Sequence, residues 1–204
     1  MVHCYSRLLR KEDTMAKLYF YYGAMGSSKS ANALMAEYNY RERGQKVLLA
    51  KTNLDTRDGK NVIRSRIGLE KECVLLSDIV KMDDETIASY DAVIVDEIQF
   101  ATSDQIDFLA RIVDTLNVPV MCYGLRSDFQ LNLFEGSQRL LAIADEIKEI
   151  KTVCWCGRKA TCNARYNKRG IVRVGAQVML GANDDYVALC RKHFIEGKLH
   201  ADDE

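Results

Sequence analysis

The residues best suited to do chemistry begin with a short run of glycine, serine and lysine. Residues 23–30 read Gly-Ala-Met-Gly-Ser-Ser-Lys-Ser, after an apolar run and before a stretch of helix formers. In that context backbone N–H groups and a helix N-terminus surround phosphates, Lys29 meets the β- and γ-phosphates, and Ser30 meets Mg²⁺. The run predicts an ATP-binding P-loop made of Gly23, Ala24, Met25, Gly26, Ser27, Ser28, Lys29 and Ser30.

Ser28 departs from this pattern, which has glycine immediately before the lysine. Glycine is favoured there because the loop backbone is strained and lies close to phosphate. Serine is small, so the departure concerns the strength of nucleotide binding and the rate rather than the choice of acceptor. The competing interpretation is a chance Gly/Ser turn before a helix.

A pair of acids supplies the second half of an ATP site. Asp96 and Glu97 follow the apolar run 93–95, and Ile98 and Gln99 come next. An acid at a strand end near a P-loop associates with Mg²⁺, here Asp96, and an adjacent carboxylate can accept the proton of an attacking hydroxyl. Standing alone, the pair would be a solvent-facing strand end. With the P-loop upstream, it predicts an ATP site that includes residues 96–99.

The third chemical group is a set of metal-ligand types near the C-terminus. Cys154 and Cys156 precede a glycine, and Cys190 and His193 form a C-x-x-H unit downstream. Three thiolates and an imidazole suit a closed, tetrahedral, structural Zn²⁺ site. The first pair is C-x-C rather than C-x-x-C, so Cys162 remains an alternative to Cys154. The competing interpretation is buried reduced cysteines and a surface histidine.

The elements that must position these groups alternate along the chain. Apolar runs predict strands at 17–22, 46–51, 92–95 and 118–124; helix formers predict helices at 30–43, 78–90, 102–117 and 137–147, the third capped by Thr102. Residues 52–72 are polar, with a turn signal at Asp58-Gly59. Strands that are apolar on both faces predict an α/β fold, a P-loop NTPase-type parallel sheet with helices on both faces.

Domain boundaries follow from changes in composition. Beyond residue 151 cysteines and β-formers replace helix formers, which predicts a small zinc-binding lobe. The expected organisation is an N-terminal extension at 1–14, a nucleotide-binding domain at 15–150, the lobe at 151–198 and an acidic tail at 199–204.

Overall charge and hydropathy exclude several classes of protein. The 204 residues carry 29 basic and 29 acidic side chains, and no apolar run approaches the ~20 residues that a membrane helix needs. A zero net charge does not favour a nucleic-acid partner, and residues 1–14 have no apolar signal region. A cytoplasmic enzyme is expected.

Several ordered blocks resemble one family. The blocks are LYFYYGAMGSSKS, DTR at 55–57, SRIGL at 65–69, VDEIQF at 95–100, CYGLRSDF at 122–129, CGRKA at 156–160 and GANDDYVALCRKH at 181–193. From Met15 to Leu199 the chain resembles the zinc-containing, homotetrameric type of thymidine kinase. That resemblance implies transfer of the γ-phosphoryl group of ATP to thymidine, giving its 5′-monophosphate for nucleotide salvage.

The resemblance also implies roles for individual residues. Glu97 matches the general base for the 5′-hydroxyl, and Asp55 and Arg57 match a pair near the transferring phosphate. A loop from about Asn163 to Gly181 matches the lasso-like segment that covers the base. The matching pocket positions are Met25, Leu125, Phe129, Gln177, Val178, Met179 and Tyr186; the matching zinc ligands are Cys154, Cys156, Cys190 and His193.

Each of these residues also has a purely structural interpretation. Phe129 and Tyr186 would be core aromatics, Met25 would be an apolar residue that fills the turn of the loop, and Arg57 would be a solvated loop residue. The resemblance further implies a homotetramer and feedback by dTTP. Two other functions share the same features: a motor or strand-exchange ATPase, which would hydrolyse ATP on DNA, and a non-catalytic nucleotide-binding zinc module.

Overall fold

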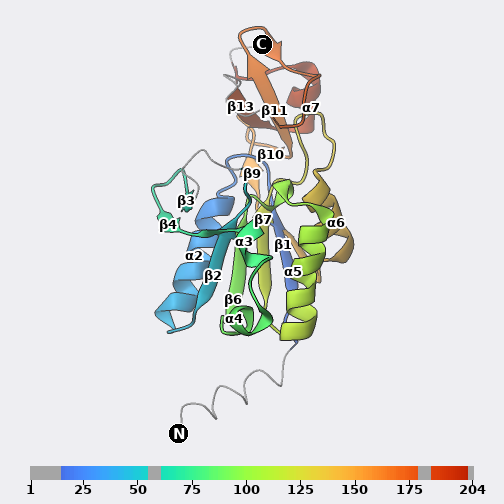
Figure 1. Cartoon of the computed structure of the whole chain (residues 1–204). Helices are drawn as coiled ribbons and strands as arrows, with labels where there is room; N and C mark the ends of the chain where they lie inside the picture. The colour runs from blue at the N-terminus through green and yellow to red at the C-terminus, as the bar shows by residue number, and fades with distance from the viewer. Residues whose placement is uncertain (1–14, 55–60, 179–184, 202–204) are drawn as a thin grey trace, which may run out of the picture.

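A six-stranded parallel sheet forms the body of the molecule (Figure 1). The computed structural model describes residues 15–54, 61–178 and 185–201. The sheet runs in the order β5-β2-β6-β7-β1-β8, and every pairing in it is parallel. Its strands are β1 (Leu18–Tyr22), β2 (Val47–Lys51), β5 (Val74–Leu75), β6 (Ala92–Asp96), β7 (Val120–Gly124) and β8 (Glu146–Glu149).

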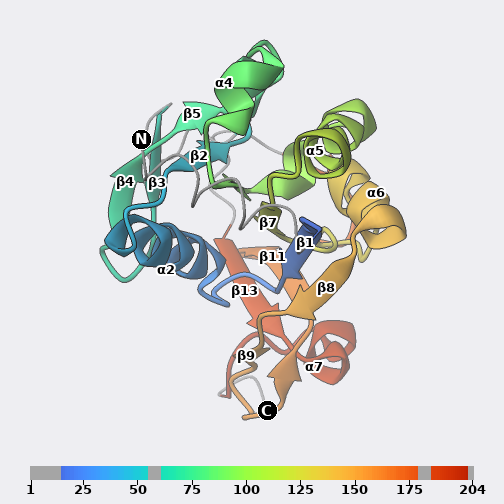
Figure 2. The same ribbon diagram turned by 90° about the horizontal axis from the view of Figure 1, so that it is seen from below.

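Helices cover both faces of this sheet, as the apolar strands predict. Val93 and Val95 of β6 belong to one apolar cluster, and Ala92 and Ile94 belong to another on the opposite face. Figure 2 shows α2 on one side and α5 with α6 on the other. The helices are α2 (Lys29–Glu42), α3 (Leu76–Ile79), α4 (Asp84–Ala88), α5 (Ser103–Leu116) and α6 (Glu135–Ile143). The predicted fold class is confirmed.

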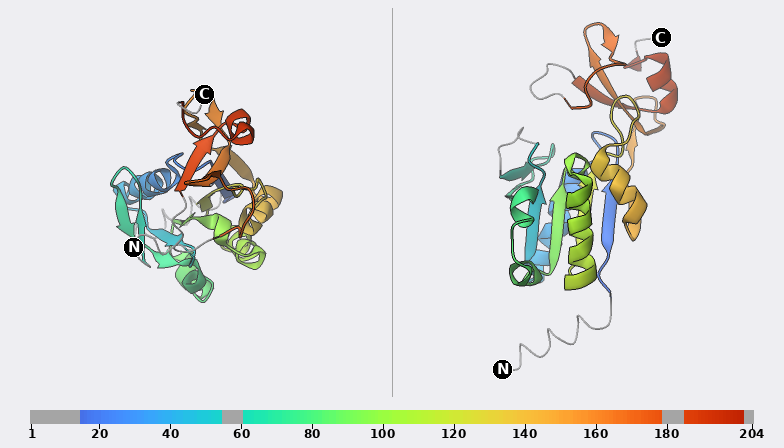
Figure 3. Two further views of the ribbon diagram at one scale, coloured as in Figure 1. Left: turned by 90° about the horizontal axis from the view of Figure 1, so that it is seen from above. Right: turned by 45° about the vertical axis from the view of Figure 1, so that its right-hand side comes forward.

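A second, smaller unit of antiparallel strands stands at the carboxyl ends of the sheet strands (Figures 1 and 3). We call it the lobe. It comprises β9 (Thr152–Val153), β10 (Lys159–Ala160), β11 (Cys162–Asn167), β12 (Gly170–Ile171), β13 (Asp185–Leu189) and α7 (Arg191–Glu196). Its apolar cluster includes Ala164, Leu189 and Phe194 and is separate from the two clusters of the sheet.

Two predicted helices are wrong in part. The helix expected at 78–90 is two short helices, α3 and α4, because Asp83 caps a new start by accepting a bond from Thr86 N at 2.7 Å. The helix expected at 137–147 ends at Ile143, and Ala144 is extended. Residues Glu146–Glu149 form β8, which pairs with β1. Pairing with a neighbouring strand overrides local helix propensity here.

A small hairpin lies in the polar stretch where only a turn was expected. It consists of β3 (Val62–Arg64) and β4 (Glu70–Glu72). Lys71 of β4 forms an ion pair with Glu37, a buried residue of α2, so the hairpin is attached to that helix.

The predicted N-terminal cap of α5 is confirmed. Thr102 Oγ1 accepts a hydrogen bond from Gln105 N, and Gln105 Oε1 accepts one from Thr102 N. Within the described ranges, no helix is both long and apolar enough to cross a membrane.

Candidate active site

The phosphate loop joins β1 to α2 at the carboxyl edge of the sheet. Gly23 admits no side chain, because a Cβ there would lie 2.3 Å from Ser27 Oγ and 2.4 Å from the carbonyl oxygen of Ile150. Lys29 is buried, and its Nζ donates to the carbonyl oxygens of Gly23 at 3.2 Å and Ala24 at 3.0 Å. The loop therefore curls around its own lysine, with the helix N-terminus beside it.

Ser28 occupies the position where the motif has glycine, and its backbone explains that preference. Its φ is 61° and its ψ is 29°, which is the left-handed region. A side chain in that region costs about 1–2 kcal/mol relative to ordinary backbone conformations. The chain thus retains the loop conformation that glycine normally supplies, and it carries the strain locally.

Asp96 ends β6 beside this loop, and its carboxylate is fully enclosed. Burial raises the pKa of Asp96 to about 7, and the neighbouring charge of Glu97 adds to the increase, whereas a hydrogen bond with the Ser30 side chain opposes it. Its Oδ1 is buried without a hydrogen-bond partner among the described atoms. A buried carboxylate with an unsatisfied oxygen next to a P-loop serine fits a divalent cation, which would supply the missing charge.

Glu97 follows directly and has an unusual backbone. Its φ of 52° and ψ of 35° place a non-glycine residue in the left-handed region, and Thr52 Oγ1 donates to its carbonyl oxygen at 3.1 Å. Gln99 Nε2 donates to Glu97 Oε2, and Gln99 Oε1 accepts from Leu125 N at 2.9 Å. The acid is therefore connected through one glutamine to the segment after β7.

That segment, residues 125–129, carries two of the predicted pocket residues. Leu125 is half-buried, and Phe129 is buried with the guanidinium carbon of Arg165 3.8 Å from its ring centroid. Arg165 of β11 is the register partner of Tyr186 on β13, so their side chains share one face. The arrangement places a buried cation against the aromatic ring of the segment, with Tyr186 beside that cation in the sheet of the lobe.

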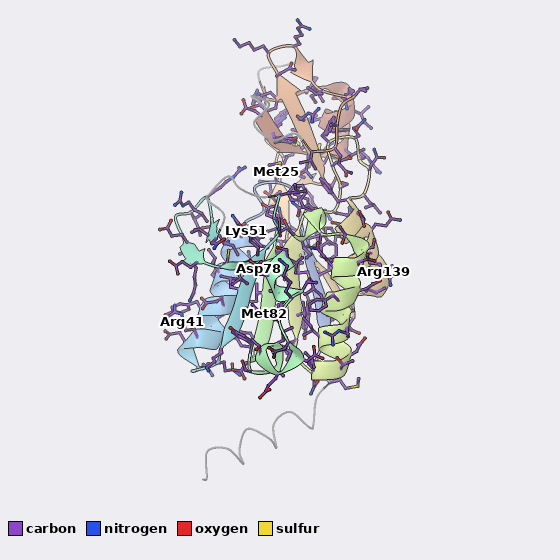
Figure 4. The ribbon with its side chains drawn as sticks, viewed as in Figure 1. Met25, Arg41, Lys51, Asp78, Met82 and Arg139 are labelled. Atoms are coloured by element: carbon purple, nitrogen blue, oxygen red, sulfur yellow. The ribbon has the colours of Figure 1, made fainter. Side chains whose placement is uncertain are left out.

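Asn163 joins the lobe to the phosphate loop, a role that its sequence context does not predict, since it was expected only as the start of the covering loop. Its Oδ1 accepts from Met25 N at 2.8 Å, and its Nδ2 donates to the carbonyl oxygen of Ser127 at 2.9 Å. Figure 4 shows Met25 at the junction between sheet and lobe. A usable signal was the alternation along β11, where Cys162 and Ala164 enter the lobe's apolar cluster while Asn163 and Arg165 face away from it.

The segment expected to cover the base is partly strand. Residues Cys162–Asn167 and Gly170–Ile171 form β11 and β12, so the expected loop does not begin at Asn163. Gln177 Nε2 donates to Asp128 Oδ2 at 2.9 Å, and Val178 is half-buried. Met179, Asp55 and Arg57 lie outside the described residues.

The four predicted metal ligands come together within the lobe. Ligand atoms of Cys154, Cys156, Cys190 and His193 all lie within 4.8 Å of one another. Cys154 Sγ is 3.5 Å from His193 Nδ1, and Cys156 Sγ is 4.0 Å from Cys190 Sγ. Tetrahedral bonds of about 2.3 Å to sulfur and about 2.0 Å to nitrogen place neighbouring ligand atoms about 3.5–3.8 Å apart. The set fits zinc.

The turn at this cluster shows why the C-x-C spacing works. Gly157 N donates to the carbonyl oxygen of Cys154 at 2.9 Å, and Gly157 has a φ of 79°, so the chain reverses immediately after the second cysteine. Trp155 between the cysteines stacks on the His193 ring at 4.1 Å. Cys162, the alternative ligand, is buried but is not one of the four grouped residues.

Comparisons with known proteins agree with this geometry. The family model described as thymidine kinase matches residues 16–194. A thymidine kinase of Zymomonas mobilis is 51% identical over 190 residues, covering 89% of this chain and 97% of the relative. A thymidine kinase of Novosphingobium aromaticivorans is 50% identical over 188 residues, covering 89% and 98%, and one of Mannheimia succiniciproducens is 45% identical over 194 residues, covering 91% and 100%. The chain belongs to the thymidine kinase family.

Proposed function

We propose that the chain transfers the γ-phosphoryl group of ATP to the 5′-hydroxyl of thymidine, with Glu97 as the general base. One observation carries the assignment. A half-buried carboxylate lies at the carboxyl edge of the sheet, next to Asp96 and the phosphate loop, and is tied to the segment that carries the pocket residues. A base must lie within hydrogen-bond reach of the hydroxyl while the phosphoryl donor is in line.

ATP binding is assigned to residues 23–30 and to the turn Asp96–Gln99. Lys29 already lies inside the curled loop, which supports its role in meeting phosphate charge. Ser30 and Asp96 would hold Mg²⁺, which supplies charge neutralisation of the phosphates when it is bound with the nucleotide. Asp55 and Arg57, beyond the described residues, are assigned to the transferring phosphoryl group through the family resemblance alone.

Thymidine binding is assigned to the space between the segment 125–129 and the lobe. Met25, Leu125, Phe129 and Tyr186 are assigned to its lining, and Gln177 and Val178 to contact with the edge of the base; Met179, beyond the described residues, is assigned there through the family resemblance alone. The bond from Gln177 to Asp128 supports this assignment because it draws the start of the covering segment toward Phe129. Closing the site over the nucleoside excludes water, which would otherwise compete as the acceptor.

Zinc is assigned a structural role in the lobe, since all four ligand positions are filled by protein side chains and none is left for substrate. A homotetramer, feedback inhibition by dTTP and a cytoplasmic location complete the proposal, and these three rest on the resemblance to the family.

A nucleoside panel tests the function. Thymidine, deoxyuridine, deoxycytidine, deoxyguanosine and no nucleoside are each incubated with Mg²⁺ and ATP, following both ADP and nucleoside monophosphate. Selective formation of thymidine 5′-monophosphate is expected. ADP without a monophosphate would indicate an ATPase, and ATP binding with neither product would indicate a non-catalytic nucleotide-binding module.

Replacing Glu97 tests the assigned base. Glu97→Gln preserves the shape of the side chain and keeps one acceptor oxygen for Gln99 Nε2, but it cannot accept the proton at neutral pH. We expect kcat to fall about 10²–10⁴-fold, with the thermal unfolding midpoint nearly unchanged. Near-normal turnover by this variant would remove Glu97 from the mechanism while leaving the nucleoside selectivity of the chain intact.

A further inference from the structure

Gln99 lies next to the proposed base, and its side-chain amide is hydrogen-bonded at both ends. It belongs to the short 3-10 helix η1 (Ile98–Phe100), which follows Glu97, and only 1% of its surface is exposed. A buried amide must satisfy both its oxygen and its nitrogen. Gln99 does so with two partners of different function, the carboxylate of Glu97 and the backbone of Leu125.

The orientation of this amide follows from chemistry. The N–H of Leu125 can only donate, so the atom 2.9 Å from it must be the amide oxygen, Oε1. The amide nitrogen then points at Glu97, whose ionised carboxylate can only accept. Flipping the amide would place its nitrogen against the N–H of Leu125, donor against donor, and its oxygen against the carboxylate of Glu97, acceptor against acceptor. Only one orientation of the amide therefore satisfies both partners.

The end of β7 packs closely against this side chain. A Cβ on Gly124 would lie 2.6 Å from Gln99 Oε1 and 3.1 Å from Gln99 N, so β7 ends in a glycine that makes space for the amide. The carbonyl oxygen of Gly124 accepts from Gly23 N at 3.2 Å. Gln99 thus lies against the strand end that also supports the phosphate loop.

The geometry of Glu97 explains what such an anchor accomplishes. Its left-handed backbone, with φ at 52°, is costly for a non-glycine residue and directs the side chain away from the strand direction. A carboxylate on a flexible stem would still rotate about its terminal bonds. The hydrogen bond from Gln99 Nε2 to Glu97 Oε2 limits that rotation and keeps the carboxylate in one orientation, as general-base catalysis requires.

We propose that Gln99 is a positioning residue: its amide fixes the carboxylate of Glu97 relative to the segment after β7 that carries the nucleoside pocket. The inference rests on the proposed role of Glu97 as the base. Gln99 itself touches neither reacting atom. Its effect reaches the reaction through Glu97, and it should therefore vanish when Glu97 no longer acts as a base.

A double-mutant cycle measures this dependence. Gln99→Met keeps the side-chain length and removes both hydrogen bonds; it is made alone and with Glu97→Gln, and kcat and KM are measured with saturating Mg²⁺ and ATP. Alone, it should lower kcat about 10- to 100-fold with KM for thymidine within about twofold. On the Glu97→Gln background it should lower kcat by less than about twofold. Gln138→Met, the same change on an exposed residue of α6, serves as the control.

Each other outcome overturns the inference. An equal loss of kcat on both backgrounds would show that Gln99 acts without Glu97. A higher KM with kcat preserved would show that it only supports the segment at Leu125. If Glu97→Gln retains turnover, the proposed base is wrong and the role of Gln99 fails with it. If Glu97→Gln loses turnover but the effect of Gln99→Met does not depend on it, only the inference about Gln99 fails.

A second variant keeps the test decisive if Gln99→Met does not fold. Gln99→Glu retains an acceptor for Leu125 N and removes only the donor toward Glu97, so it places two carboxylates face to face. It should lower both kcat and the unfolding midpoint. Adding Glu97→Gln recreates the pair with its roles exchanged, and the midpoint should return toward the wild-type value while kcat stays at the Glu97→Gln level. Failure of the midpoint to recover would contradict the pairing.

Discussion

The sheet domain and the lobe solve the problem of stability in opposite ways. The sheet buries two apolar clusters, one on each face, from residues spread along most of the chain. The lobe has one small cluster, three of whose members are cysteines of the sequence's C-terminal group, and it leaves Val153 and Ile195 exposed. So small a core provides little burial energy, and a metal commonly makes up the difference. The comparison indicates that the two units depend on different forces.

The proposed substrate sites nevertheless draw on both units. Hydrogen bonds cross between them at Asn163, which reaches Met25 and Ser127, and at Gln177, which reaches Asp128. The Asn163 bonds are made at the carboxyl edge of the sheet, where the phosphate loop lies. A substitution in either unit should therefore alter the same proposed substrate site, although the physical cause differs between the two units.

The largest effect is expected from removing a zinc ligand. Cys190→Ser should abolish zinc retention and unfold the lobe while the sheet stays folded, because structural zinc contributes about 10–16 kcal/mol to the folding of small zinc domains. Hydrogen exchange followed by mass spectrometry should show protection lost over 152–171 and 185–196 and kept over 92–124. Zinc content per chain is measured on the same samples.

Cys162→Ala provides the matched control, since Cys162 is buried in the same lobe but lies outside the ligand group. This variant should retain one zinc per chain and its exchange protection. Loss of zinc in Cys162→Ala, with retention in Cys154→Ala, would assign the fourth ligand to Cys162. Uniform loss of protection over both units would contradict their independence.

A smaller effect is expected in the sheet domain, from the buried carboxylate of Asp96. Its folded pKa is about 7, against an ordinary value of 3.8. The folded chain therefore keeps a proton that the unfolded chain releases, and stability falls as pH rises from about 4 to about 7. Asp96→Asn removes this penalty. In Mg²⁺-free buffer it should gain roughly 2–4 kcal/mol at pH 8 and nearly nothing at pH 4, while losing activity.

Chemical denaturation at several pH values measures this difference. Asp114→Asn, an exposed change near the end of α5, should shift stability by less than about 0.5 kcal/mol across the same range. A constant gain for Asp96→Asn at every pH would mean that the carboxylate is not protonated in the fold. The gain in stability would then come from the shape of the side chain at this site and not from removal of a buried charge.

The two units also differ in how much of them the sequence predicts. The phosphate loop, the Asp96–Glu97 pair and the four metal-ligand types were predicted because each depends on residue types at short spacing. The central strands were predicted because they are apolar on both faces. Even the position of Ser28 proved informative, since the left-handed backbone at that residue is the reason for the motif's glycine.

The remaining features depend on partners far away in the chain. The helix predicted at 137–147 runs into the first two residues of β8, because local helix propensity favours a helix there and only pairing with β1 makes these residues a strand. Asn163 and Arg165 are unremarkable in sequence and acquire meaning from Met25 and Phe129, more than 30 residues earlier. Gln99 was assigned with the ATP turn, and its contact with Leu125 was not predictable from spacing.

The last prediction concerns the junction between the units. Asn163→Ala leaves the N–H of Met25 and the carbonyl oxygen of Ser127 without their shared partner, and an unsatisfied buried group costs about 1–3 kcal/mol. Zinc should be retained, because Asn163 is not a ligand. The unfolding free energy should fall by about that amount, and KM for thymidine should rise, because the lobe would no longer be held against the phosphate loop.

Two companion changes show which bond matters at this junction. Asn163→Asp keeps an acceptor for Met25 N and removes the donor to Ser127, so it should recover part of the loss if the phosphate loop is the important partner. Asn167→Ala, at an exposed position on the same strand whose side chain accepts from the nearby Arg169 N, should change KM little. If Asn163→Ala leaves both stability and KM unchanged, the units are joined by other contacts, and the lobe would act on the site through its covering segment alone.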